Sequence, residues 1–238
     1  MTLPRRAAAE AVGTAFLLLA VVGSGIMGER LAGGNDAIVL LANSIATGCA
    51  LVALILTFRP ISGAHFNPAI TLADATQGGL GWRDVPAYLA AQVFGAFAGV
   101  ATAHLMFGEA VFTASSHARS GLAEVFAEFV ATFGLLSVIW GCSRSRSIAA
   151  VPFAVAAYIT GAYWFTSSTS FANPAVTLAR AASDTFAGIR PNDAPMFVLA
   201  QLGGAMAATA MWRWLSPVIP AMAPGVVVPP RGSNQASP

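Results

Sequence analysis

A short stretch that occurs twice limits what this chain can fold into. Residues 66–74 read FNPAITLAD and residues 171–180 read FANPAVTLAR, and from the Asn onward six of eight positions are identical. Asn is a good helix N-cap and Pro fits the first helical position, so each copy predicts a helix that begins at Asn-Pro-Ala. The two copies therefore predict two short helices in equivalent positions of an internal repeat.

The composition is typical of a membrane protein. Charged residues make up 9% of the 238 residues, hydrophobic residues make up 56%, and the mean hydropathy is +0.70. Soluble domains carry about 25% charged residues. The net charge of +2 is small and the basic residues do not cluster, so we expect no nucleic-acid partner. Cys49 and Cys142 lie in or beside apolar segments, which does not indicate a disulfide framework.

A membrane-spanning helix needs ~20 mostly apolar residues. Six segments meet this requirement: about 7–28, 37–58, 85–107, 121–142, 148–166 and 194–215. The two Asn-Pro-Ala segments, 67–76 and 173–182, are too short. Arg5, Arg6 and the apolar run that follows also resemble a secretory signal. Glu10 at the start of that run has a counterpart in mid-chain, which favours a first membrane helix instead.

The repeat extends beyond the short segments. Residues 9–18 resemble 127–136, and residues 90–99 resemble 199–208. These matches align two pairs of polar residues, Glu10 with Glu128 and Gln92 with Gln201. Three spans in each repeat require the two halves to lie in opposite orientations, and in such inverted repeats the interrupted segments mark the transport pathway.

We predict one membrane domain over residues 1–218, with repeats over about 5–108 and 120–216. Residues 219–238, which are rich in Pro, Gly, Ser and Asn, are predicted to form a disordered tail. Six spans put both ends on one side, where eight arginines fall against four on the other side. The positive-inside bias then predicts that both termini are cytoplasmic.

Two half-helices that enter from opposite faces would meet N-terminus to N-terminus. Their partial positive charges would oppose cations and protons midway along a pore. The amides of Asn67 and Asn173 would donate to a passing solute. We expect the stretches before each Asn to be extended, with carbonyl groups that line the pore at Gly63, Ala64, His65, Thr169 and Phe171. Ordinary capping chemistry is the alternative, and it does not explain two copies in equivalent positions.

Glu10 and Glu128 are carboxylates predicted to lie within the membrane, where such groups are costly and functional or paired. One interpretation is a proton or ion relay. The other, which we favour because the pair follows the repeat, is that each carboxylate accepts hydrogen bonds from a re-entrant loop. Gln92 and Gln201 are assigned a similar structural role, and Glu124 is left without one.

Together these motifs resemble the aquaporin, or major intrinsic protein, family. The resemblance covers about residues 5–215 and rests on AExxGT at 9–14, SGAHFNPAIT at 62–71, FANPAVT at 171–177 and the repeated Glu and Gln. It implies an all-α bundle of six tilted helices and two half-helices, with one pore per subunit and usually four subunits. It also implies a bacterial-type inner membrane location, passive conduction of water or small neutral solutes, and no cofactor or metal.

In this family four side chains set the narrowest point of the pore. Counting from the two Asn-Pro-Ala motifs, Asn67-Pro68-Ala69 and Asn173-Pro174-Ala175, places them at Thr47, Gly161, Ser170 and Val176. Water-selective members have an aromatic residue, a His, a small residue and an Arg there. Small residues and Val176 in place of the Arg predict a wide, neutral filter. The pattern resembles bacterial aquaglyceroporins associated with arsenic handling, which implies arsenous acid and organoarsenicals as candidate solutes.

Two ionisable residues near the pore have alternative interpretations. Arg180 lies one helical turn beyond Val176 and could reach the outer vestibule. We favour instead a pair with Asp184 or a side chain that extends to the membrane surface. His65 could titrate in the pore near neutral pH, or it could be structural. His104 and His117 are not spaced like metal ligands.

We weigh several functions against one another. The first is a channel for neutral solutes, and the second is a water-selective channel whose filter differs from the one counted above. An ion-coupled transporter would share inverted repeats and broken helices, and an ion channel is a further alternative without the filter Arg. No phosphate loop, metal-ligand cluster or nucleophile elbow indicates an enzyme.

Overall fold

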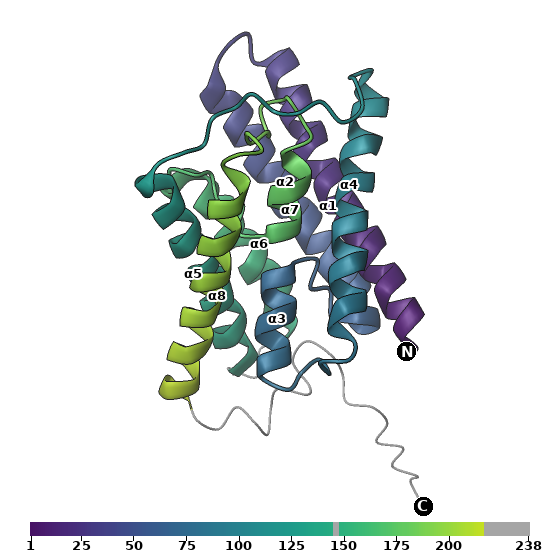
Figure 1. The fold of residues 1–238 in the computed structure, drawn as a ribbon, viewed down its shortest axis with the longest axis vertical. Helices are drawn as coiled ribbons and strands as arrows, with labels where there is room; N and C mark the ends of the chain where they lie inside the picture. The colour runs from purple at the N-terminus through teal and green to yellow at the C-terminus, as the bar shows by residue number, and fades with distance from the viewer. Residues whose placement is uncertain (145–147, 217–238) are drawn as a thin grey trace, which may run out of the picture.

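The structure is a computed structural model that describes residues 1–144 and 148–216. Within these ranges it holds α-helices, one short 3₁₀ turn and no strand (Figure 1). The elements are α1 Leu3–Leu31, α2 Asp36–Ser62, α3 Pro68–Thr76, α4 Val85–Phe107, α5 Leu122–Arg144, η1 Ile148–Ala150, α6 Val151–Phe165, α7 Pro174–Arg180 and α8 Ala194–Leu215. The predicted tail 219–238 lies outside the described residues.

The observed helices confirm the predicted fold class. Five helices are long and apolar enough to cross a membrane, and α6 is a shorter apolar helix that follows η1. The start of α1 and the end of α8 lie at the same end of the bundle (Figure 1). Helix ends follow local chemistry: Asn35 caps the start of α2, and Gly63 ends it with a left-handed φ of 97°.

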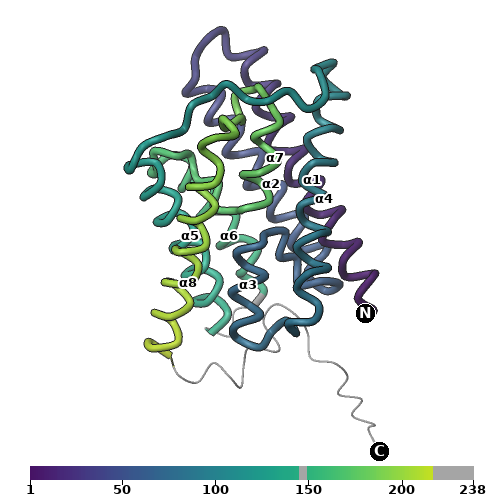
Figure 2. The backbone as a smooth tube through the Cα atoms, in the orientation of Figure 1, coloured from purple at the N-terminus to yellow at the C-terminus, as the bar shows by residue number. Residues whose placement is uncertain are grey.

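The two repeats pack in equivalent ways. Helix α1 packs against α4 and α2, while α5 packs against α8 and α6, and α2 meets α6 between the halves. Figure 2 shows α3 and α7 one above the other in the middle of the bundle, enclosed by the long helices. Both short helices contact α4 and α8, so each short helix is held by both repeats.

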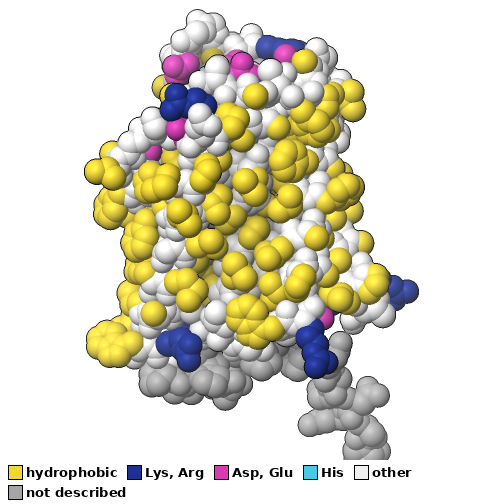
Figure 3. Space-filling model, in the orientation of Figure 1, with side chains coloured by type: hydrophobic (Ala, Val, Ile, Leu, Met, Phe, Trp, Pro, Cys, Tyr) yellow, Lys and Arg dark blue, Asp and Glu magenta, His cyan; other side chains and the backbone are white. Residues whose placement is uncertain are grey.

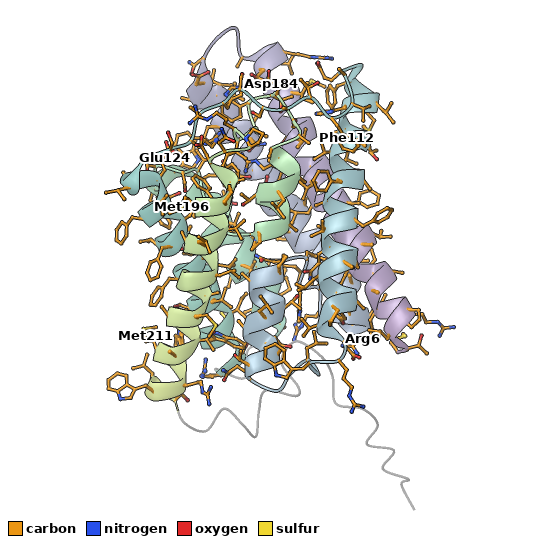
Figure 4. The ribbon with its side chains drawn as sticks, in the orientation of Figure 1. Arg6, Phe112, Glu124, Asp184, Met196 and Met211 are labelled. Carbon is orange, nitrogen blue, oxygen red and sulfur yellow. The ribbon has the colours of Figure 1, made fainter. Side chains whose placement is uncertain are left out.

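The outer surface suits a lipid environment. Figure 3 shows hydrophobic side chains over most of the visible face, with charged side chains gathered toward the two ends. Large exposed apolar residues from several helices contribute to this surface, among them Phe16, Leu56, Phe94, Phe126 and Leu199. Figure 4 places Arg6 and Asp184 toward opposite ends of the molecule. The chain is a multi-pass membrane protein.

Two glycines in equivalent repeat positions allow close helix contacts. A Cβ atom on Gly95 of α4 would overlap the carbonyl oxygen of Ala11 in α1. A Cβ atom on Gly204 of α8 would overlap the carbonyl oxygen of Phe129 in α5. Small residues let membrane helices approach closely without a hydrophobic driving force. These glycines therefore set the spacing within each repeat.

We expect Gly204→Ala to destabilise the protein by about 1–3 kcal/mol, because the added methyl group forces α8 away from α5. Gly203→Ala is the matched control, since its Cβ would meet only the Phe129 ring at 3.6 Å, an ordinary contact. Thermal unfolding of both variants in detergent tests this expectation. Equal melting temperatures for the two variants would contradict it.

Candidate functional site

The two loops before the short helices do not have the extended backbone that we predicted. Ala64 and Phe66 have φ angles of 53° and 49°, and Thr169, Ser170 and Ala172 have φ angles of 60°, 52° and 48°. Non-glycine residues rarely adopt this left-handed region, which costs about 1–3 kcal/mol per residue. The surrounding structure must therefore hold both loops in place.

The carboxylate of Glu10 holds the first loop. It accepts the backbone N–H groups of His65 at 3.0 Å and Phe66 at 2.7 Å. The Ser62 hydroxyl donates to it at 2.6 Å and the Gln92 amide at 2.8 Å. Glu10 is fully buried, and these protein donors occupy both of its oxygens.

The carboxylate of Glu128 holds the second loop in the same way. It accepts the backbone N–H groups of Phe171 at 2.8 Å and Ala172 at 2.9 Å. The Gln201 amide donates to it at 2.6 Å. Each Gln also donates at 2.8 Å to a hydroxyl of a short helix, Thr71 for Gln92 and Thr177 for Gln201. This geometry favours loop anchoring over an ion relay for both carboxylates.

Asn67 and Asn173 join the two repeats at the centre. Each side-chain oxygen accepts the backbone N–H two residues further on, at 2.9 Å and 3.0 Å, and so caps α3 or α7. Each side-chain nitrogen donates across to the other loop. Asn67 donates to the Ala172 carbonyl at 2.7 Å, and Asn173 donates to the Phe66 carbonyl at 2.8 Å. An amide has two N–H groups, so one on each Asn has no protein acceptor among the described residues.

A cavity of about 90 Å³ runs beside these asparagines. A water needs about 10–15 Å³ measured this way, so the cavity holds several waters or one small solute. Four helices give it an apolar wall through residues four apart on one face: Leu17 and Val21; Leu51 and Ile55; Leu135 and Ile139; Val151, Val155 and Ile159. The two loops also line the cavity, through residues 63–67 and 170–173.

Three of the four residues counted as the filter line this cavity: Thr47, Ser170 and Val176. Gly161 does not, because it is exposed on the outer side of α6, and its assignment is corrected. Tyr163 lines the cavity instead, and its hydroxyl lies 3.1 Å from the Thr47 hydroxyl. Two residues correspond to about 200° around a helix, so a small counting error reverses the direction of the side chain.

Two other predicted pore residues have different surroundings. The Thr169 side chain lies outside the cavity lining and accepts a 3.4 Å bond from Arg119. His65 contributes to the lining, but its imidazole is buried. Its Nδ1 lies 3.0 Å from the Thr71 hydroxyl and its Nε2 lies 3.6 Å from Asp74 Oδ2. Asp74 is itself buried beside this histidine.

Arg180 lines the cavity and is 2% exposed. Its Nε donates to the Ala187 carbonyl, and its guanidinium carbon lies 3.3 Å from the centre of the Phe171 ring. The interpretation that we favoured, a pair with Asp184 or a side chain that extends to the membrane surface, does not describe this buried arginine. Asp184 instead accepts the backbone N–H and the hydroxyl of Ser116 at 2.8 Å and 2.9 Å. These bonds hold the pKa of Asp184 below its ordinary value.

Arg119 is a residue near the site that sequence reasoning did not single out. It lies in the segment between α4 and α5, and its guanidinium donates to the carbonyls of Gly188 at 2.8 Å, Ser168 at 3.3 Å and Phe186 at 3.3 Å. Its guanidinium carbon lies 5.2 Å from the Phe171 ring. No spacing in the sequence indicates this contact, because the segment crosses from the other repeat.

Comparison with known proteins gives consistent results. The family described as "Major intrinsic protein" matches residues 1–159. The chain is 54% identical over 213 residues to aquaglyceroporin AqpS of Rhizobium meliloti (strain 1021), which covers 90% of this chain and 91% of that protein. It is 39% identical over 140 residues to aquaporin NIP1-1 of Oryza sativa subsp. japonica, which covers 58% of this chain and 48% of that protein. Among solved structures, the aquaglyceroporin from Plasmodium falciparum has the same fold, with a TM-score of 0.75, 20% identity, and coverage of 92% of this chain and 99% of that chain.

Proposed function

We propose that this chain, which belongs to the major intrinsic protein family, is a passive channel that conducts a broad range of small uncharged solutes. Members of this family are channels, so the chain is a channel and not an enzyme. A relative named as an aquaglyceroporin supports small neutral solutes such as glycerol. The proposed range comprises water, glycerol-like polyols, arsenous acid and organoarsenicals.

The observation that carries this proposal is the mixed lining of the cavity. Four helices contribute apolar side chains to its lining, and the two loops contribute backbone groups and the amides of Asn67 and Asn173. A polyol has the same two kinds of surface, since its hydrogen-bearing carbons can face the helices while its hydroxyl groups pair with loop carbonyls and amides. Arsenous acid is also an uncharged molecule with three hydroxyl groups. The polar part of the lining suits both solutes.

The apolar residue at position 176 supports solutes larger than water. Val176 is buried and contributes to the cavity lining, where water-selective family members carry Arg. Valine is smaller than arginine, so it leaves more room in the cavity. It also lacks the charged guanidinium group that discriminates against solutes with apolar surface. Tyr163 narrows the same cavity, so the proposed pore is less open than three small filter residues would make it.

The finer cellular assignments are also proposals. The excess of arginine on the side of the termini supports cytoplasmic ends in a bacterial inner membrane. Small residues on the outer helix faces and the family resemblance support a homotetramer with one pore in each subunit. The domain is proposed to cover residues 1–218.

Flux measurements in liposomes test the function directly. We expect stopped-flow light scattering to record water and glycerol fluxes about tenfold or more above empty liposomes, because a lined path lowers the barrier by at least about 1.4 kcal/mol. Arsenous acid flux should rise in parallel. Water flux with strong glycerol exclusion would contradict the proposal and support the water-selective alternative. Flux that follows a proton gradient would instead support a coupled transporter.

A further inference from the structure

We propose that Arg180, and not a residue at position 176, is the cation of this channel's selectivity constriction. In this position it would exclude cations and donate hydrogen bonds to an oxygen atom of the solute, while Phe171 covers the apolar side of the solute. The inference rests on the proposed function and specifies the solute class: uncharged molecules with an acceptor oxygen next to an apolar group.

The guanidinium of Arg180 has hydrogen-bond donors that no described residue accepts. Its Nε donates to Ala187, and none of the described residues accepts a hydrogen bond from its two terminal nitrogens. A guanidinium has five N–H donors, and a buried donor without a partner is costly. Because Arg180 is 2% exposed and lines the cavity, water or solute in the cavity is the partner that these donors can reach.

The charge of Arg180 is not neutralised by a nearby carboxylate. None of the salt bridges among the described residues includes it, and Asp184 is engaged by Ser116. The guanidinium carbons of Arg180 and Arg119 lie 3.3 Å and 5.2 Å from the Phe171 ring centre. Glu128, the carboxylate that anchors this loop, accepts its hydrogen bonds from two backbone N–H groups and Gln201 and none from Arg180. Arg180 therefore brings to the cavity a guanidinium group that forms no salt bridge among the described residues.

The helix geometry explains how Arg180 reaches the cavity. Val176 and Arg180 are four residues apart on α7, so they share one face of the helix. Helical side chains lean back toward the N-terminus, which brings the Arg180 guanidinium down toward the constriction. The positive charge thus lies one turn beyond Val176, the apolar residue three positions after Asn173.

Phe171 is fixed as the apolar partner of this charge. Its ring packs edge-on against Phe197 with centroids 5.4 Å apart, and the residue lines the cavity. An arginine over an aromatic face is attracted to the ring and keeps its N–H edges available. The pair presents a donor edge beside an apolar surface, which matches a hydroxyl group next to carbon or another apolar substituent.

The test compares three substitutions of Arg180 in liposomes. We expect Arg180→Leu to raise sodium flux about tenfold or more and to lower the ratio of glycerol to water flux, since it removes both charge and donors. Arg180→Gln should raise sodium flux but keep the glycerol ratio, because its amide still donates. Arg180→Lys should retain both properties. The control is Arg30→Leu, which removes an exposed arginine paired with Glu109 and should leave both readouts unchanged.

A double variant distinguishes loss of the charge from misfolding. Adding Val176→Arg to Arg180→Leu should restore sodium exclusion, because it returns a positive charge to the cavity. Water flux per protein and melting temperature identify variants that fold, and Arg180→Gln replaces Arg180→Leu if the latter does not. Folded Arg180→Leu and Arg180→Gln variants that both exclude sodium as well as the wild type would overturn the inference. A wild-type protein that conducts no glycerol would contradict the proposed function itself, so the two failures can be distinguished.

Discussion

Glu10→Ala is expected to prevent the first loop from keeping its left-handed backbone and to abolish stable, active channel. The carboxylate accepts four hydrogen bonds, two of them from the backbone N–H groups of His65 and Phe66. Each buried donor left without a partner costs about 1–3 kcal/mol. Total stabilities are about 5–15 kcal/mol, so losing several partners at a strained loop removes a large part of the stability.

The yield of monodisperse protein in detergent, its melting temperature and its water permeability measure this effect. Glu128→Ala should behave in the same way, because it leaves the N–H groups of Phe171 and Ala172 unpaired. Glu10→Gln should be intermediate, since one amide oxygen replaces two carboxylate oxygens. Glu109→Ala is the control, because Glu109 is exposed and pairs with Arg30 at the surface. A Glu10→Ala protein with the wild-type melting temperature would refute the anchoring role.

Val176→Arg is expected to reduce glycerol and arsenous acid flux strongly while water flux falls less. Val176 is buried against a cavity of about 90 Å³, so a longer side chain occupies space that a polyol needs and a single file of water does not. The new charge also lies one helical turn from Arg180. Two neighbouring charges raise the energy barrier to the passage of solutes with apolar surface. An added barrier of about 1.4 kcal/mol corresponds to a tenfold lower rate, and we expect at least that for glycerol.

Solute fluxes through Val176→Arg and Val176→Ala in liposomes provide the comparison. Val176→Ala removes two methyl groups and should leave the order of solutes unchanged. The ratio of glycerol to water flux is the informative quantity, because it does not depend on the amount of inserted protein. An equal loss of all solutes in Val176→Arg would argue against a filter role for this position.

The fold could be predicted from the sequence because long apolar segments and an internal repeat are strong signals. The predicted spans 85–107 and 194–215 coincide with α4 and α8. The two Asn-Pro-Ala segments also begin where predicted, since Asn67 and Asn173 supply the cap and proline follows. These features depend on residues close together in the chain, and local chemistry is readable from a sequence.

The parts that could not be predicted depend on how distant segments meet. Gly161 was reached by counting through a loop whose shape was unknown, and the position that faces the cavity is Tyr163. The apolar residues four apart on α6, Val155 and Ile159, indicate that face of the helix and would have selected Tyr163. Arg119 approaches from a separate segment, so neither spacing nor periodicity could place it beside Phe171.

The exchange of hydrogen bonds between the two loops has a consequence for biogenesis. Asn67 pairs with Ala172, which follows it by 105 residues, and Asn173 pairs with Phe66. While the ribosome is still making the second repeat, the first re-entrant segment lacks the partner that holds its end. We therefore expect the first half to enter the membrane with its loop anchored by Glu10 but with the Asn67 amide unpaired, and the permeation path to be completed when both halves dock. A pore that opens only after synthesis is complete would protect the cell from a leaky nascent chain.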